Sequence, residues 1–163
     1  MIKPKPLKIG DRVAVVAPSS AADLKSVNEG EIKIRALGLI PVMYPTCYSN
    51  YGHLSASDEE RAKDINDSFK DESIKGIICL RGGYGTMRIL NMLDYEMIKS
   101  NPKVFVGFSD ITALHTAFNQ ICHMVTFHGP MATTNFAKVK NEKVEFEHYS
   151  CESFVKNIFT AAN

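Results

Sequence analysis

Five short apolar runs constrain the fold of this chain more than any other feature of its sequence. Each run is rich in hydrophobic, often β-branched residues and stops at a proline, a glycine or a polar turn. Continuous apolar runs of this length are typical of strands buried on both faces of a parallel sheet. The expected strands lie at residues 12–17, 39–44, 76–80, 104–107 and 124–127. We expect the second strand near a sheet edge, because Pro41 cannot donate a ladder hydrogen bond.

Helical patterns alternate with these runs. Asp23 can cap a helix over residues 24–37, which Gly38 would end, and Ser57 with Glu60 fits a capping box. Strands that alternate with helices at this spacing predict an α/β fold. Its parallel sheet would be flavodoxin-like or class I amidotransferase-like, with helices on both faces and right-handed crossovers. The remaining expected helices lie at 61–69, 86–93, 110–121 and 151–159, and the expected loops or linkers at 46–57 and 138–148.

The composition narrows the possible function classes. The chain has 163 residues, 45% of them hydrophobic and 23% charged, which suits one globular domain or one half of a larger enzyme. A net charge of +1 gives no basic footprint for nucleic acid, and no apolar run approaches the ~20 residues of a membrane helix. No apolar segment of a signal peptide follows the N-terminal lysines. Four scattered cysteines without metal-ligand spacing suggest reduced thiols in a cytosolic protein.

Three polar or glycine-rich turns follow the first, third and fourth expected strands. They are Pro18–Ser20, Arg81–Gly85 and Phe108–Asp110. Ligands bind beyond the carboxyl ends of parallel strands, so we expect these turns to meet and to form the site. Paired glycines let backbone amides face a ligand, although a tight turn without a ligand is the alternative explanation.

Ser109 lies where the fourth strand passes into a helix. Such a turn can raise a serine hydroxyl above the sheet edge as a nucleophile, with the amide of the next residue behind it. The alternative is that Ser109 is an ordinary helix N-cap. We expect Asp110 to complement the helix dipole rather than to act as an acid or base.

No histidine has an obvious place as the general base. His115 lies six residues after Ser109 on the same helix, about 240° around its axis, and should not contact it. His128 follows the last strand and can approach the site, although a structural role is the more frequent one for such a residue. No carboxylate is recognisable as an orienting partner, and no metal-ligand spacing is present, so we expect no metal and no cofactor.

Five ordered blocks of this sequence resemble the LD-carboxypeptidase family of serine peptidases, and together they cover about residues 7–135. This family comprises murein tetrapeptide carboxypeptidases and microcin C self-immunity peptidases. The blocks are Gly10–Asp11 leading into Val15–Ser20, Ser57–Ala62, Arg81–Gly85, Gly107–His115 and Thr126–Met131.

The resemblance implies a cytoplasmic enzyme that removes the terminal D-alanine from murein tetrapeptides during cell-wall recycling. The family's serine nucleophile maps onto Ser109, and its oxyanion hole maps onto the backbone amides of Asp110 and Gly83. The candidates for lining the pocket of the murein peptide are Arg81, Gly82, Tyr84, Ser19 and His128. The microcin C branch tends to carry a glycine-glycine-asparagine turn instead, so the intact Arg81–Gly85 turn favours the murein branch.

The chain departs from the family in its length. Members carry the glutamate and histidine of a Ser-Glu-His triad in a C-terminal domain. We expect residues 1–137 to form the N-terminal nucleophile domain, and residues 138–163 to form a linker and the start of an otherwise missing C-terminal domain. Hydrolysis should then depend on the missing half, and apolar surface left bare by it favours a homodimer. The alternative is a non-catalytic α/β module that binds an anion at the glycine turn and helix N-termini.

Overall fold

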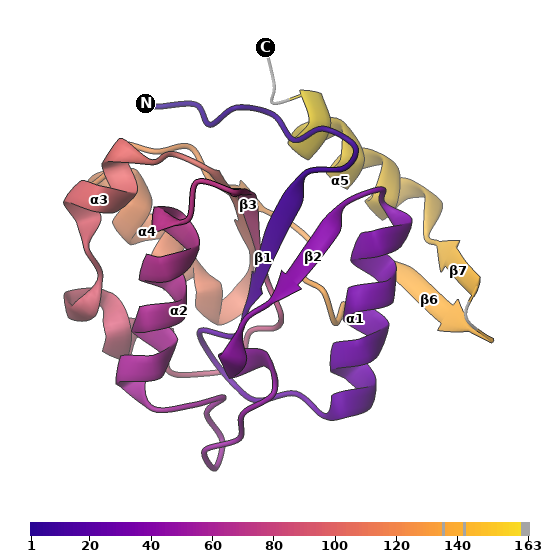
Figure 1. The fold of residues 1–163 in the computed structure, drawn as a ribbon, viewed down its shortest axis with the longest axis horizontal. Coiled ribbons are helices and arrows are strands. Elements are labelled where there is room, and N and C mark those ends of the chain that lie inside the picture. The colour runs from indigo at the N-terminus through magenta and orange to yellow at the C-terminus, as the bar shows by residue number, and fades with distance from the viewer. Residues whose placement is uncertain (135, 142, 161–163) are drawn as a thin grey trace.

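The chain forms a five-stranded parallel sheet between two layers of helices (Figure 1). The computed structural model describes residues 1–134, 136–141 and 143–160. The strand order β2-β1-β3-β4-β5 is the flavodoxin-like order, and it confirms the predicted α/β class. The strands are β1 (Arg12–Val16), β2 (Ile40–Met43), β3 (Ile74–Cys79), β4 (Val104–Gly107) and β5 (Phe127–His128). As predicted from its proline, β2 is an edge strand.

Helices cover both faces of the sheet. One face carries α1 and α5, on the right in Figure 1, and the other carries α2, α3 and α4. The helices are α1 (Leu24–Ala36), α2 (Asp58–Lys70), α3 (Tyr95–Ser100), α4 (Thr112–Gln120) and α5 (His148–Thr160). Short 3₁₀ helices lie at η1 (Pro45–Cys47), η2 (Thr86–Met92) and η3 (Ser109–Ile111).

The alternation of side chains along a strand divides the core into two parts. In β1, Val13 and Val15 pack with α1, while Ala14 and Val16 pack on the α2 side. All four are fully buried. Burial on both faces explains why the strand sequences are continuous apolar runs instead of alternating patterns.

The predicted caps are present. The side chain of Asp23 accepts a hydrogen bond from the amide of Ser26 at the start of α1. Ser57 and Glu60 form the complete capping box at the start of α2. Both boundaries follow from local chemistry, so the sequence was sufficient to predict them.

Two predicted elements differ because of pairing that the sequence pattern does not reveal. The helix expected at 86–93 is the 3₁₀ helix η2, and Asp94 then caps the separate helix α3. The strand expected at 124–127 is reduced to Phe127–His128, because Met124 pairs with the N-terminal residue Ile2 instead of with β4.

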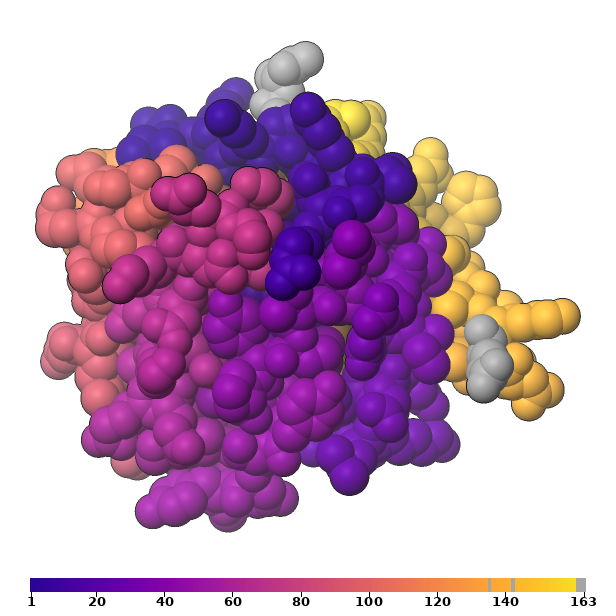
Figure 2. Space-filling model, viewed as in Figure 1, coloured from indigo at the N-terminus to yellow at the C-terminus, as the bar shows by residue number. Residues whose placement is uncertain are grey.

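The charged segment after residue 137 is also more regular than expected. It forms an antiparallel hairpin of β6 (Ala137–Lys140) and β7 (Lys143–Phe146), where a loop was predicted. The valines Val139 and Val144 face each other across the hairpin. This orange hairpin protrudes beyond α1 in Figure 2. The domain boundary near residue 137 stays a prediction.

The last helix is part of the core. Cys151, Phe154 and Ile158 on α5 are buried, and they pack with the apolar side chains of β4. The carbonyl of Ile158 also accepts a hydrogen bond of 2.9 Å from the amide of Leu7. Helix α5 therefore covers part of the sheet face that also carries α1.

The four cysteines, all in the described part of the chain, are buried and unpaired. In that part no helix combines the length and the apolar character that crossing a bilayer would require.

The burial of α5 can be tested by truncating one of its core side chains. Phe154→Ala should lower the free energy of unfolding by about 3 kcal/mol, because it leaves a cavity against Phe136. Tyr149→Ala on the same helix is the control and should change it by less than about 0.5 kcal/mol, since Tyr149 is 82% exposed. Urea denaturation of both variants measures the difference. Equal effects would show that α5 does not contribute to the stability of the sheet.

Candidate active site

The three turns expected to form the site do meet, and the carboxylate of Asp110 joins them. Its Oδ2 atom accepts hydrogen bonds from the Ser19 hydroxyl at 2.6 Å and from the Thr86 hydroxyl at 2.6 Å. The amide of Thr86 donates a third bond of 2.9 Å. One oxygen atom therefore connects the segments that follow β1, β3 and β4, at the lower edge of the sheet in Figure 1.

These bonds also set the ionisation of Asp110. Partial burial by itself would raise the pKa, but the hydrogen bonds from Ser19 and Thr86 outweigh it, so the pKa lies below the usual range. The group is a carboxylate at neutral pH. As expected, Asp110 lies in the first turn of η3. Its hydrogen bonds with Ser19 and Thr86 hold the neighbouring turns together.

Ser109 adopts a conformation that is rare for a serine. Its φ of 63° is in the left-handed region, and its side chain is exposed. Phe108 holds the N-cap position of η3, so the interpretation of Ser109 as a helix cap is wrong. Within the described residues the Ser109 hydroxyl makes no hydrogen bond. A strained, exposed serine between strand and helix is the geometry of a nucleophile elbow.

The glycine turn lies directly against this serine. A Cβ added to Gly82 would lie 3.1 Å from the Cβ and 3.3 Å from the Oγ of Ser109. Gly83 has a φ of 132°, and a Cβ there would meet the Ser20 hydroxyl at 2.1 Å. No side chain fits at Gly83. Over the described part of the chain, the amides of Gly83 and Asp110 have no hydrogen-bond acceptor.

Among the other predicted pocket residues, Arg81 and Tyr84 are exposed, whereas Ser19 is fully buried. Ser19 thus supports the turn through Asp110. Its neighbour Ser20 accepts a hydrogen bond of 3.2 Å from the amide of Tyr84.

The sequence analysis missed the buried arginine that supports the site. The guanidinium of Arg61 is fully buried and donates to the carbonyls of Pro18 (2.6 Å), Gly85 (3.0 Å) and Ala56 (3.2 Å). It also pairs with Asp58. A signal was available, because Arg61 lies four residues before Ile65 and therefore on the buried stripe of α2. Thr86 was also missed, and no pattern in the sequence distinguishes it.

Neither His115 nor His128 hydrogen-bonds to Ser109 in the described part of the chain. His115 Nε2 lies 2.9 Å from the carbonyl oxygen of Gly107, which can only accept, so this nitrogen carries the hydrogen. Burial lowers the pKa of His115 and keeps it neutral. His128 is exposed, with its ring 5.9 Å from that of Phe108 and 6.2 Å from that of His115. Its ring makes no hydrogen bond in residues 1–134, 136–141 and 143–160, and both roles considered for His128 stay predictions.

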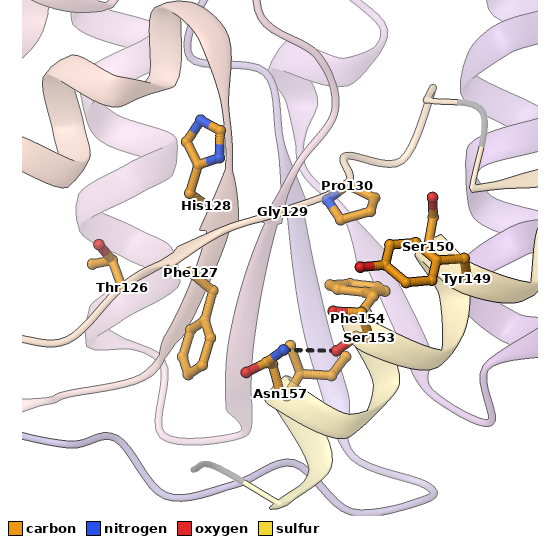
Figure 3. A pocket seen from close by; sticks show the side chains of 11 residues that line it. Thr126, Phe127, His128, Gly129, Pro130, Tyr149, Ser150, Ser153, Phe154 and Asn157 are labelled. Carbon is orange, nitrogen blue, oxygen red and sulfur yellow. Dashed lines mark hydrogen bonds between the residues drawn. The ribbon is translucent and has the colours of Figure 1, made fainter.

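A groove of about 430 Å³ lies between β5 and α5. Figure 3 shows Phe127 beside this helix, while the His128 ring points to the opposite side of the strand. Ser109 does not line the groove, and no lysine, arginine or carboxylate does so either. The groove therefore adds no lysine, arginine or carboxylate to the site.

The described residues thus provide a serine, free backbone donors and a rigid turn. In this part of the chain no cluster of histidine, cysteine and carboxylate side chains could hold a metal ion. The arrangement can present a nucleophile and stabilise an oxyanion, and it lacks a general base in contact with the serine.

Comparison with known proteins gives consistent matches. A family model described as the LD-carboxypeptidase N-terminal domain matches residues 13–129. A probable murein peptide carboxypeptidase of Bacillus subtilis is 41% identical over 133 residues, which is 82% of this chain and 42% of that protein. The chain therefore spans less than half the length of this relative.

Solved structures match over nearly the whole chain. An MccF-like protein from Bacillus anthracis superimposes with a TM-score of 0.86 at 28% identity, covering 97% of this chain and 47% of that one. A muramoyltetrapeptide carboxypeptidase from Oxalobacter formigenes gives a TM-score of 0.75 at 25% identity, covering 90% and 47%.

The link through Asp110 makes a prediction about stability and pH. Asp110→Asn should lower the free energy of unfolding at pH 7 by about 1–2 kcal/mol. This loss is smaller than for a hydrogen bond to a fully buried charge, because Asp110 is partly exposed and solvent screens its charge. The folded pKa is depressed, so the contribution of the carboxylate is present above the unfolded value of 3.8 and is lost as the pH falls through the folded pKa. The difference between wild type and variant should shrink towards pH 3.

Urea denaturation at pH 7 and pH 3 measures this difference. Asp67→Asn is the matched control, since the Asp67 side chain is 46% exposed and pairs with Lys63 on the surface. It should change the stability by less than about 0.5 kcal/mol at either pH. A loss for Asp110→Asn that does not depend on pH would contradict the role of its charge.

Proposed function

Because the chain belongs to the LD-carboxypeptidase family, we propose that it is the N-terminal half of a serine carboxypeptidase that removes the terminal D-alanine from murein tetrapeptides. The observation that carries this proposal is the conformation of Ser109. Its left-handed backbone, exposed side chain and free hydroxyl are costly for a residue with only a structural task. They suit a nucleophile that must reach a substrate carbonyl.

The mechanism assigns a role to each part of the turn. Ser109 Oγ attacks the scissile carbonyl, and the negative charge that develops on its oxygen is held by the amides of Gly83 and Asp110. The base takes the proton of the Ser109 hydroxyl and gives it to the amine of D-alanine, which leaves as the C–N bond breaks. Water then hydrolyses the acyl-serine ester, which releases the shortened peptide acid and restores the hydroxyl. Arg61 and the Asp110 carboxylate hold the turns in place, so the donors need no reorganisation during the reaction.

The base belongs to the other half of the enzyme in this proposal. A Ser-Glu-His triad would be completed by a glutamate and a histidine from a C-terminal domain. This division fits the coverage of less than half of the Bacillus subtilis relative. Without a base Ser109 is a weak nucleophile, and this chain alone should be inactive.

Two relatives point to different substrates. The microcin C self-immunity branch is the second candidate, because an MccF-like structure matches with a TM-score of 0.86. The fold similarity does not distinguish the branches. The Arg81–Gly85 turn and the 41% identity with a probable murein peptide carboxypeptidase favour the murein substrate.

We also propose a cytoplasmic location and a homodimer. A murein-recycling enzyme acts on peptides returned to the cytoplasm. Apolar side chains at the glycine turn and the start of η2, Tyr84 (54% exposed) and Met87 (61% exposed), would favour self-association. Sedimentation equilibrium of the chain tests the dimer, and a monomer at all concentrations would refute it.

The division of the active site predicts a clear difference in activity. The chain alone should release no D-alanine from a murein tetrapeptide, whereas its fusion to the C-terminal half of the Bacillus subtilis relative should release it. Ser109→Ala in the fusion should lower kcat by at least about 10³-fold. Ser100→Ala, on the exposed end of α3, is the control and should leave the rate unchanged.

Mass spectrometry of the released D-alanine gives the rates. Robust turnover by the chain alone that disappears in Ser109→Ala would refute the division. It would point to His128 or to a base from a partner.

A further inference from the structure

A carboxypeptidase must recognise a free carboxylate close to its nucleophile, and this requirement rests on the proposed function. The terminal carboxylate lies one residue beyond the scissile carbonyl. One residue spans at most about 3.6 Å, so the group that binds the carboxylate must lie at the same turn as Ser109. The carboxyl edge of the sheet must therefore supply a cation with free donors.

The cations at this edge are few, and most are already engaged. Arg61 is buried and pairs with Asp58. The same carboxylate binds Arg88 at 2.9 Å, and Lys25 lies 4.0 Å from a glutamate of its own helix. Arg81 makes no ion pair within the described ranges. It is the exposed arginine that a ligand can reach without breaking an existing pair.

The guanidinium of Arg81 is held against the glycine turn, and its donors are not all used. Its Nε donates to the carbonyl of Gly82 at 3.2 Å, and its Nη1 donates to the carbonyl of Ala21 at 3.0 Å. Gly82 is the glycine that packs against Ser109. An arginine has five N–H donors, so both hydrogens of Nη2 and one of Nη1 remain available.

The carboxylates near the turn do not compete for these donors. Asp110 Oδ2 accepts from Ser19 and Thr86, Asp23 accepts from Ser26 at the start of α1, and neither carboxylate forms an ion pair with Arg81 within the described residues. A carboxylate from the substrate would therefore meet a positive charge that no other described group neutralises. The planar fork of a guanidinium matches a carboxylate with two parallel bonds.

We propose that Arg81 binds the terminal carboxylate of the substrate and thereby restricts the site to peptides with a free C-terminus. The two carbonyl bonds fix the guanidinium next to the glycine turn. Two contacts then place the scissile carbonyl over Ser109. The amides of Gly83 and Asp110 bind its oxygen, and Arg81 binds the carboxylate of the following residue. Peptides extended or amidated at this end lose the anchor.

The test uses the 163-residue chain and two probes that differ in one group. The probes are Nα-acetyl-L-lysyl-D-alanine and its C-terminal amide, titrated by following the NMR resonances of the Gly82, Gly83 and Ser109 amides. The acid should bind at least about tenfold more tightly than the amide. Arg81→Gln should abolish this preference, and Arg81→Lys should restore part of it because the charge returns without the fork.

Arg88→Gln is the matched control, since Arg88 is an exposed arginine of the same edge that Asp58 already engages. It should retain the full preference for the acid. Added salt should weaken binding of the acid probe and leave the amide unchanged. Equal binding of both probes by wild type, no binding of either, or a preference that survives Arg81→Gln would each overturn the proposal.

Failure of the proposed function is detected separately. It would appear as a fusion protein that releases no D-alanine, whatever the binding preference of the chain. The release assay depends on Ser109, whereas the binding assay depends on Arg81.

Discussion

The buried guanidinium of Arg61 is the interaction on which the rest of the site depends. It binds the carbonyls of Pro18, Ala56 and Gly85, which belong to three different loops. Burying a charge costs free energy unless the charge is paired and its N–H groups find acceptors. For Arg61, Asp58 provides the opposite charge and the three carbonyls provide the acceptors. Removing this one side chain would leave several buried carbonyl groups without a partner. The positions of the serine turn and the glycine turn therefore depend on a residue that touches neither reacting atom.

The Asp110 carboxylate completes this support from the other side. It connects the segments after β1, β3 and β4 through a single oxygen. Between these two polar centres the backbone of Ser109 is held at a φ of 63°, a conformation that an isolated turn would abandon. Donors that are fixed before the substrate arrives are the ones that stabilise an oxyanion most, because they do not need to reorient. Under the proposed function, the chain thus supplies the rigid half of an active site.

The comparisons illustrate why the fold alone does not define the chemistry. An MccF-like protein and a muramoyltetrapeptide carboxypeptidase both superimpose on this chain, with TM-scores of 0.86 and 0.75. A shared fold does not fix substrate choice, and in this chain Arg81 and Tyr84 are among the exposed side chains at the glycine turn.

The sequence by itself determined the elements whose causes are local. Apolar runs defined the strands, Asp23 and Ser57 defined helix starts, and the ordered motifs pointed to Ser109 and to the family. Only the tertiary structure decided the rest. Within residues 124–127, Met124 pairs with the N-terminal segment and Phe127 pairs with β4, while residues 137–146 form a hairpin. Ser109 has a strained backbone and is not a helix cap. The tertiary structure also decided that Arg61 and Asp110 join the turns. The physical reason is that pairing partners and buried hydrogen bonds come from residues far apart in the chain, for example the 91 positions between Ser19 and Asp110. Local propensity carries no information about such contacts.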